Sequence, residues 1–338
     1  TEEGGHIMSL IESICKNIYP LDTRFMEQAQ ARQDRLIKPQ GSLGKLEEIS
    51  IQLAGIYGSK YFDTTKKIVL SFACDHGVYE EGVAPNNQNI TLLQSMNFPK
   101  KINGVGTISK FVGSDVQLID VGINCDEPIE GVIDCKIRKS TSNMAKGPAM
   151  TRQEAIRAIE IGIEMSEKYI QEDYKVIGIG EMGIANTTPS AAIICVIAGC
   201  DPQEVTGMGA GLKKELLQHK AQVIRTAIEI NQPNPTDGID ILQKVGGFEI
   251  GSMAGVILGC SANRVPVVLD GFISYAAALI AVNINPRCKD YMIASHYSAE
   301  PGAKKALELL GLDPFLKMDM RLGEGSGAAL AFNMIEAA

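Results

Sequence analysis

Tryptophan is absent from the sequence, and aromatic residues make up only 5% of its 338 residues. A hydrophobic core must therefore be built mainly from aliphatic side chains. Hydrophobic residues reach 45%, which is enough to fill a large α/β domain or two smaller ones. Charged residues reach only 21%, an ordinary value for a folded protein that argues against a disordered chain.

Disulfide and metal-ligand patterns are also missing. The eight cysteines form no C-x-x-C pair, and several of them, such as Cys195 and Cys260, stand among apolar or small residues. We therefore expect buried, reduced thiols in a cytoplasmic protein. The four histidines lack ligand spacing, so we expect no structural zinc site.

Basic clusters and long apolar runs are equally scarce. The formal net charge is -8, and no Lys/Arg cluster opposes it, so binding to nucleic acid is not expected. No stretch is long and apolar enough to span a bilayer, and no signal peptide is recognisable. A small anionic substrate remains possible, because backbone N–H groups and one lysine can hold a phosphate within an acidic protein.

Short β-branched runs alternate with helical patterns along the chain. The predicted strands are residues 67–73, 116–121, 175–179 and 265–269. The predicted helices between them are residues 151–170, 189–198, 212–230 and 272–282. This alternation predicts a parallel sheet covered by helices on both faces. Ligands of such sheets bind beyond the carboxyl ends of the strands, so the loops there are the place to seek chemistry.

The N-terminal segment has a different pattern. Residues 9–57 are predicted to be helical, with a break at 38–44 (KPQGSLG), because Pro39 and two glycines do not suit a helix interior. Residues 1–7 resemble the remnant of a tag and do not enter the fold prediction.

Residues 178–183 (GIGEMG) match the dinucleotide fingerprint G-x-G-x-x-G after a predicted strand. An NAD-dependent oxidoreductase is therefore one hypothesis. The next helix, however, is predicted to begin near Thr188 and Pro189, too late for its N-terminus to meet a diphosphate. Glu181 would also place a negative charge inside the loop. A glycine loop that holds one phosphate, with Glu181 facing a hydroxyl or a cation, fits better.

Two further patterns leave alternatives open. Residues 207–211 (GMGAG) expose backbone N–H groups, and Lys220 on the following helix either adds a positive charge to them or is simply solvated. Asp75 and His76 follow a predicted strand and suggest a general base or triad. No suitably placed nucleophile accompanies them, so we expect His76 to be structural or to contact a substrate.

Near the C-terminus, glycines flank Glu324 in the run 321–327 (RLGEGSG). They leave the carboxylate little steric cover and let a ligand approach the backbone. In an apolar, glycine-lined pocket such a carboxylate can act as a base near neutral pH. The pattern fits equally well a carboxylate stabilised at the start of a helix.

Eight motifs spread over nearly the whole chain belong together. They are KPQGSLG (38–44), FACDHGV (72–78), GEMGIANTTP (180–189), NQPNP (231–235), KVGGF (244–248), LDGFI (269–273), SHYSAE (295–300) and RLGEGSGAAL (321–330). Together they resemble the family of nicotinate-nucleotide:dimethylbenzimidazole phosphoribosyltransferases, which activate the lower-ligand base of cobalamin.

The resemblance implies a reaction and roles for particular residues. Nicotinate mononucleotide would give its phosphoribosyl group to an aromatic base, with inversion at the anomeric carbon, and nicotinate would leave. Glu324 would be the general base, and Glu181, Gly183, Gly209 and Lys220 would bind phosphate and ribose. No metal or organic cofactor is implied. A non-catalytic partner of an active subunit is a further hypothesis, which the presence of Glu324 and Lys220 disfavours.

The positions that match the family's base pocket are Asn86, Gln94, Met182 and Leu322. Asn86 stands where a smaller hydroxyl residue is expected, and Met182 where leucine is expected. Gln94 carries an amide that could hold a ring nitrogen. The acceptor is therefore 5,6-dimethylbenzimidazole or an analogue, and some relatives instead use purines, phenol or p-cresol.

The resemblance also implies the organisation of the chain. A large Rossmann-like α/β domain would span residues 61–304, and a small helical domain would combine residues 8–60 with 305–338. The family forms dimers, so we expect a homodimer. A heterodimer with a paralogue is the alternative, because the phenol-activating relatives pair non-identical subunits.

Overall fold

The computed structural model describes residues 9–338, so the suspected tag remnant at residues 1–7 lies outside the described residues. A six-stranded sheet of order β3-β2-β1-β4-β5-β6 crosses this part of the chain, and every neighbouring pair is parallel. The strands are β1 (Lys67–Cys74), β2 (Asp115–Gly122), β3 (Ile133–Asp134), β4 (Val176–Met182), β5 (Val267–Leu269) and β6 (Met292–Ala294). The predicted parallel α/β fold is confirmed.

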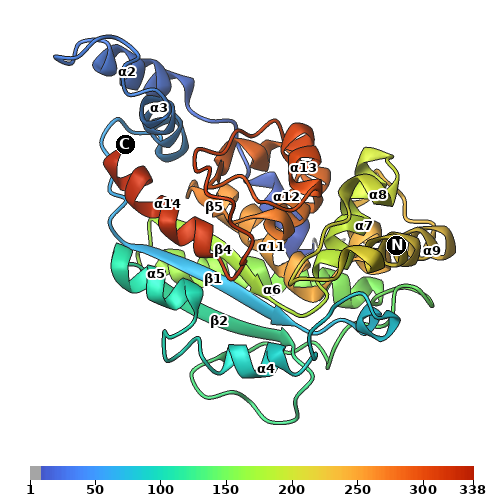
Figure 1. The fold of residues 1–338 in the computed structure, drawn as a ribbon. Coiled ribbons are helices and arrows are strands. Elements are labelled where there is room, and N and C mark those ends of the chain that lie inside the picture. Colours follow the sequence, from blue (N-terminus) through green and yellow to red (C-terminus); the bar gives the residue numbers. More distant parts are fainter. Residues whose placement is uncertain (1–8) are drawn as a thin grey trace, which may run out of the picture.

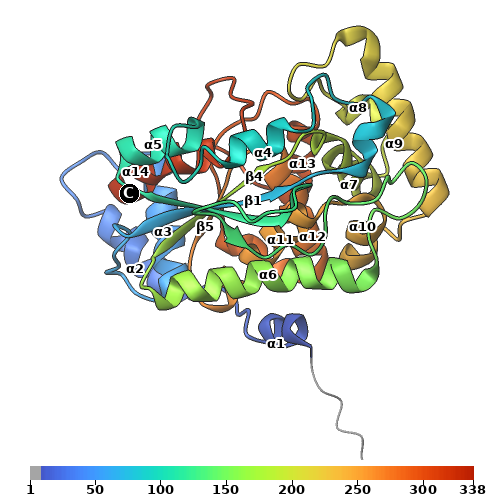
Figure 2. The ribbon, with the colours of Figure 1, turned by 90° about the horizontal axis from the view of Figure 1, so that it is seen from below.

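Helices cover both faces of the sheet (Figures 1 and 2). One face carries α6 (Arg152–Gln171), α11 (Phe248–Ala262) and α12 (Phe272–Ile284), and the other carries α4 (Ile90–Ser95), α5 (Gly104–Val112) and α14 (Ser326–Ala337). Successive side chains of a strand point to opposite faces of the sheet, so the side chains of β1 contribute to a hydrophobic core on each face. Leu70 and Phe72 pack toward the first face, whereas Val69 and Ala73 pack toward the second.

All four predicted strands occur in the structure, shifted by a few residues at their ends. Helix α7 (Thr187–Ala198) begins two residues earlier than predicted. Helix α9 (Leu217–Asn231) begins five residues later, after the 3₁₀ turn η2 (Lys214–Leu216). The strands β3 and β6 were not predicted, because two or three residues are too few to show a period.

Helix α11 was not predicted either, and its packing explains why. All its residues from Phe248 to Ser261 are buried, so the helix has no polar face and shows no amphipathic period. Its glycines allow close contact with α6. A Cβ at Gly255 would lie 1.9 Å from the carbonyl oxygen of Ile159.

The N-terminal segment forms α1 (Leu10–Lys16), α2 (Thr23–Gln33) and α3 (Lys45–Tyr57), with the predicted break before α3. Helices α2 and α3 project from the body of the molecule (Figure 1). Helix α14 packs against α3, but also against α5 and the sheet. The division into domains 8–60 plus 305–338 and 61–304 stays a prediction.

The remaining elements connect these layers. They are η1 (Gly77–Glu81), α8 (Pro202–Val205), α10 (Gly238–Val245), η3 (Pro286–Tyr291) and α13 (Gly302–Leu310). Within residues 9–338, we find no helix with the length and apolarity that a membrane span requires.

Candidate active site

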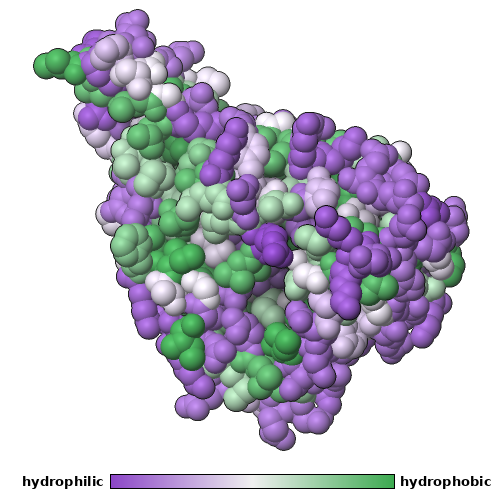
Figure 3. All heavy atoms as spheres, viewed as in Figure 1, coloured by the Kyte–Doolittle hydropathy of each residue, from purple (hydrophilic) through white to green (hydrophobic). Residues whose placement is uncertain are grey.

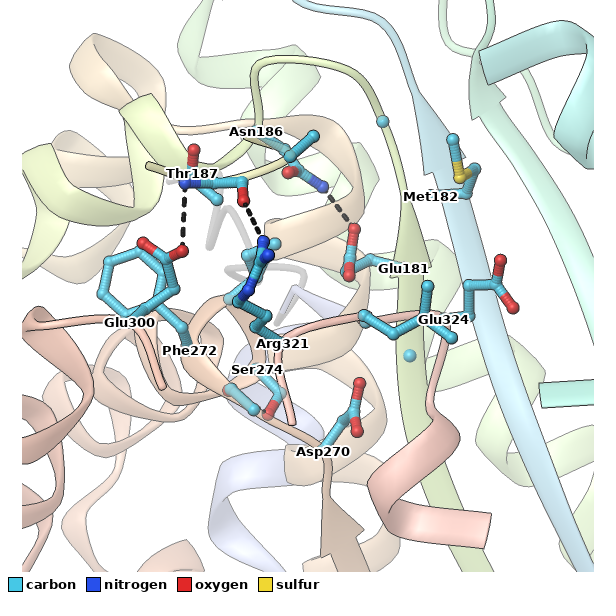
Figure 4. A pocket seen from close by; sticks show the side chains of 18 of the residues that line it. Glu181, Met182, Asn186, Thr187, Asp270, Phe272, Ser274, Glu300, Arg321 and Glu324 are labelled. Carbon is cyan, nitrogen blue, oxygen red and sulfur yellow. Dashed lines mark hydrogen bonds between the residues drawn. The ribbon is translucent and has the colours of Figure 1, made fainter. Parts of the chain in front are cut away.

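A cavity of about 270 Å³ opens beyond the carboxyl ends of β4 and β5 (Figure 4). Its walls come from the loops that follow β4, β5 and β6, from α4, and from residues 321–324 before α14. This is the edge at which the sequence predicted the site, because parallel strands present their following loops together there.

Glu324 is buried in the wall of this cavity and accepts three hydrogen bonds. Gln94 Nε2 donates to Oε1 at 2.7 Å, and Asn103 Nδ2 and the Val105 amide donate to Oε2 at 3.0 Å each. Such donors stabilise an ionised carboxylate and fix its direction. The expected apolar surroundings of Glu324 are therefore wrong, since its immediate partners are amides.

The backbone at Glu324 has an unusual conformation. Glu324 has φ 64°, and its neighbours Gly323 and Gly325 have φ 88° and 91°. Glycine adopts this left-handed region without steric cost, whereas a glutamate does not. Ser71 on β1 donates to the carbonyl oxygen of Glu324 at 2.7 Å and helps to hold it.

The first two glycines of the run 178–183 do not form a phosphate loop. Gly178 and Gly180 lie inside β4, so the predicted glycine loop begins too early. A Cβ at Gly180 would lie 2.3 Å from the Glu324 carbonyl oxygen, and one at Gly178 would lie 3.0 Å from Ala328 and Phe332 side-chain atoms. These glycines let the segment around Glu324 and helix α14 pack directly on the strand.

Three further buried carboxylates, Glu181, Asp270 and Glu300, line the same cavity, as Figure 4 shows. Burial, together with the nearby charge of Asp270, raises the pKa of Glu181 to about 8, although the hydrogen bond from Asn186 opposes the shift. Burial also raises the pKa of Asp270 to about 7, against hydrogen bonds from the amides of Gly327 and Gly325. A protonated carboxyl can donate a hydrogen bond, so Glu181 can face a hydroxyl of a ligand.

Two of the residues predicted to bind phosphate and ribose, Gly209 and Lys220, lie on the side of the cavity away from Glu324. Gly209 donates its N–H to Glu300 Oε1 at 3.0 Å and accepts at its carbonyl oxygen from Arg321 Nη1 at 3.2 Å (Figure 4). Lys220 lies behind this loop, where its Nζ donates to Thr187 Oγ1 at 2.7 Å and to the Gly207 carbonyl oxygen at 3.2 Å.

Lys220 is therefore not a solvated residue. Its side chain is 1% exposed, and burial lowers the pKa of the ammonium group to about 8, while Glu300 opposes that shift. Lys220 lines a small cavity of about 40 Å³ together with Gly183 and Thr187. Gly183 and Thr187 also line the main cavity, so Lys220 is one layer behind its wall.

The four predicted base-pocket residues, Asn86, Gln94, Met182 and Leu322, all line the main cavity. Leu322 is 59% exposed at the cavity mouth. The Gln94 amide is engaged at both ends, because its Oε1 also accepts from Asn97 Nδ2 at 3.1 Å. In this structure Gln94 therefore orients Glu324 rather than presenting a free amide to a ligand.

His76 is buried outside the main cavity and does not form a dyad with its neighbour Asp75. Its Nε2 lies 2.8 Å from Glu249 Oε1, while Asp75 accepts from the Asn124 amide at 2.8 Å. Cys74, His76 and Glu249 place potential metal-ligand atoms within 4.8 Å of one another. Burial raises the pKa of the Cys74 thiol well above its usual value, and its Sγ donates to the Asp75 carbonyl oxygen at 3.1 Å while His76 pairs with Glu249, so in this structure the three residues form a structural cluster.

Sequence reasoning did not assign roles to Asn103, Asn186, Asp270 and Glu300. Asp270 and Glu300 stand in the motifs LDGFI and SHYSAE, yet no spacing rule links either motif to Glu324. Asn103 precedes α5 without any motif. Only the folded chain brings Asn186, Asp270 and Glu300 to the cavity and Asn103 to Glu324.

Comparisons with known proteins agree with the geometry. A family model described as phosphoribosyltransferase matches residues 18–338. Two relatives are named nicotinate-nucleotide–dimethylbenzimidazole phosphoribosyltransferase. The protein of Clostridioides difficile (strain 630) is 73% identical to this chain, and that of Alkaliphilus metalliredigens (strain QYMF) is 51% identical. Each match covers 98% of this chain and 95% of the relative. The solved structure of the Thermus thermophilus enzyme has a TM-score of 0.89 and 36% identity, covering 94% of each chain.

Proposed function

The chain belongs to the phosphoribosyltransferase family, and from this premise we propose the reaction that its cavity performs. The protein transfers the phosphoribosyl group of nicotinate mononucleotide to an aromatic lower-ligand base, 5,6-dimethylbenzimidazole or an analogue. The products are nicotinate and an α-riboside 5′-phosphate for cobamide nucleotide-loop assembly. The relatives named above carry the name of this reaction.

The charges of the cavity suit this donor. Cleavage of the glycosidic bond develops positive charge on the ribose, and Glu181 lies in the cavity wall where a carboxylate can stabilise it. The phosphate would lie at the other end, near Gly183, Gly209 and the N-terminus of α7. There the helix N–H groups and Lys220, one layer behind, offer positive potential.

The role of Glu324 follows from the attack step. One ring nitrogen of the base forms the new bond to the anomeric carbon as the bond to nicotinate breaks with its electron pair. The N–H proton on the other ring nitrogen must then be lost, and Glu324 is proposed to accept it. The observation that carries this proposal is the buried Glu324 carboxylate in the cavity wall, held by three donors beside Met182 and Leu322.

The test is Glu324→Gln, which keeps the shape of the side chain but cannot accept the proton; it leaves one acceptor oxygen for the three donors and turns an NH₂ group toward the others. Removal of a general base typically lowers kcat by about 10²–10⁴-fold. We expect that loss when nicotinate release is followed chromatographically, with nicotinate mononucleotide binding unchanged by calorimetry. Near-normal turnover in this variant would refute the role of Glu324. A wild-type protein that releases no nicotinate with any benzimidazole, purine or phenol would refute the reaction itself.

The identity of the base is a separate proposal. Met182 and Leu322 give the pocket apolar walls that suit the ring of a substituted benzimidazole, so we propose 5,6-dimethylbenzimidazole as the preferred acceptor. Phenol or p-cresol, used by one subunit of a heterodimer, is the alternative. Assaying equal concentrations of these bases in competition decides between them. A phenolic product in excess over the benzimidazole product would overturn the preference.

We further propose a cytoplasmic homodimer that needs no metal or organic cofactor. All eight cysteines are free thiols, which suits a reducing compartment. Apolar side chains are exposed on and beside α4 and α5, next to the cavity, as Figure 3 shows. They are Leu93 (54% exposed), Ile102 (62%) and Phe111 (81%). Several exposed apolar side chains in one region of the surface favour a second subunit. Light scattering that gives a monomer mass would contradict the dimer.

A further inference from the structure

Asp270 is a buried carboxylate to which the proposed proton transfer assigns no role. It follows β5 directly, is 3% exposed, and lines the cavity. Its two oxygens accept hydrogen bonds from the backbone on either side of Ser326. Gly325 N–H donates to Oδ2 at 3.0 Å, and Gly327 N–H donates to Oδ1 at 2.7 Å.

These two amides belong to the first turn of α14, which begins at Ser326 with no side-chain cap of its own. The first amides of a helix need acceptors, and its N-terminus carries partial positive charge. Asp270 supplies both an acceptor and a negative charge, although it lies 55 residues earlier in the chain. It therefore caps the helix from a neighbouring strand.

The capped turn is continuous with the strained backbone of Glu324. A non-glycine residue in the left-handed region costs roughly 1–3 kcal/mol and persists only when its surroundings hold it there. Ser71 holds the carbonyl group of Glu324, and Asp270 holds the amide of the next residue, Gly325. The Glu324 peptide is thus held from both β1 and the end of β5.

Close packing shows that the arrangement has little room to shift. A Cβ at Gly327 would lie 2.0 Å from His296 Nδ1 and 2.8 Å from Asp270 Oδ1. A Cβ at Gly325 would lie 2.4 Å from Val69 Cγ1. Only glycine lets both amides approach Asp270 this closely.

We propose that Asp270 is a positioning residue for the transfer reaction: by binding the Gly325 and Gly327 amides it fixes the left-handed backbone of Glu324 and so aims the Glu324 carboxylate at the base. The proposal rests on the proposed role of Glu324 as general base. Asp270 acts through Glu324 and need not touch the substrate.

The test begins with Asp270→Asn, which preserves size but leaves one acceptor oxygen for two amides and turns an NH₂ group toward the other. A misplacement of about 1 Å at a reacting group can cost about 10²-fold in rate. We expect kcat to fall by about that factor, with KM for nicotinate mononucleotide changed by less than about threefold. A rise in KM for nicotinate mononucleotide with kcat unchanged would mean that Asp270 binds substrate, and it would overturn the proposal.

A double-mutant cycle separates positioning from direct catalysis. If Asp270 acts through Glu324, adding Asp270→Asn to Glu324→Gln should lower kcat by no more than about twofold beyond the single Glu324→Gln variant. Losses that multiply would show that Asp270 works independently of Glu324, and the positioning role would be wrong.

Asp120 provides the matched control. Its buried carboxylate accepts from two backbone amides, those of Gly122 and Ile123, at Oδ1, and its Oδ2 pairs with Lys136 Nζ at 3.3 Å, so Asp120→Asn removes a buried charge pair at the carboxyl end of β2. It makes no hydrogen bond to the turn around Glu324 within the described residues. We expect Asp120→Asn to lower the melting temperature without the selective loss of kcat. An equal loss of kcat in both variants would show that Asp270 has only a structural role, and the proposal would be wrong.

Amide hydrogen exchange, which does not depend on turnover, tests the anchoring role of Asp270 separately from the proposed reaction. Amide hydrogen exchange over residues 321–332 should be faster in Asp270→Asn than in the wild type and in Asp120→Asn. If Glu324→Gln keeps its activity, the general-base role fails, yet faster exchange would still show that Asp270 anchors this turn. Unchanged exchange would refute the anchoring in either case.

Discussion

Gly180→Ala tests the packing that holds Glu324 against the sheet. The added Cβ would lie 2.3 Å from the Glu324 carbonyl oxygen and 2.4 Å from the Gly325 nitrogen, whereas ordinary van der Waals contact begins at 3.4 Å. Both neighbours are backbone atoms, so no side chain can rotate away. The turn must move by about 1 Å, and a displacement of that size at a reacting group can lower the rate about 10²-fold.

The same substitution also overpacks the core, which typically costs about 1–3 kcal/mol of stability. Gly178→Ala is the matched control on the same strand. There the added Cβ would meet side-chain atoms of Ala328 and Phe332 at 3.0 Å, and the turn around Glu324 would stay in place.

The assay is kcat for nicotinate release at saturating nicotinate mononucleotide and base, with the melting temperature measured in parallel. We expect both variants to lose some stability and only Gly180→Ala to lose about 10²-fold in kcat. A folded Gly180→Ala variant with kcat within about threefold of the wild type would refute the reasoning. An equal loss of kcat in Gly178→Ala would refute it as well.

Two further predictions concern the buried carboxylates and their donors. The pKa of Glu181 is raised from 4.5 to about 8 in the folded protein, so between these values the folded state binds more protons than the unfolded chain and its stability falls as pH rises. Glu181→Gln should therefore show a smaller drop in melting temperature between about pH 6 and 8.5 than the wild type. An unchanged drop would contradict this prediction. Gln94→Leu removes the 2.7 Å hydrogen bond to Glu324. Because hydrogen bonds to charged groups contribute about 1.5–3 kcal/mol, kcat should fall roughly tenfold or more. Asn97→Ala, which removes only the hydrogen bond at the other end of the Gln94 amide, is the control, and equal kcat values in the two variants would contradict the orienting role.

The fold was largely predictable because its signals are local. The run at 67–73, apolar except for Lys67 and Ser71, and the turn residues after it are enough to identify β1 and the edge where ligands bind. Helix α11 escaped prediction because a helix buried on all sides has no period to detect. Its glycines look like helix breakers until the contact with α6 is known.

The same ambiguity affected the run at 178–183. The spacing G-x-G-x-x-G is identical whether a glycine is needed in a phosphate loop or for the close approach of another backbone. Only the position of Glu324 over Gly180, 144 residues away in the chain, shows that the second reason applies. The family resemblance pointed to Glu324 without that knowledge, because it depends on motifs rather than on packing.

The grouping of carboxylates in the site could not be predicted from local sequence patterns. Glu181 comes from β4, Asp270 follows β5 and Glu324 lies in the turn before α14, so these three carboxylates are far apart in the sequence. Burial raises the pKa of Glu181 and Asp270, so at neutral pH their desolvation weakens the folded state. Hydrogen bonds from Asn186 and from the Gly325 and Gly327 amides offset part of that cost. A pyridinium donor and a ribose that becomes cationic as its bond breaks bring positive charge into the cavity, so Glu181 stabilises the reacting state more than the empty site.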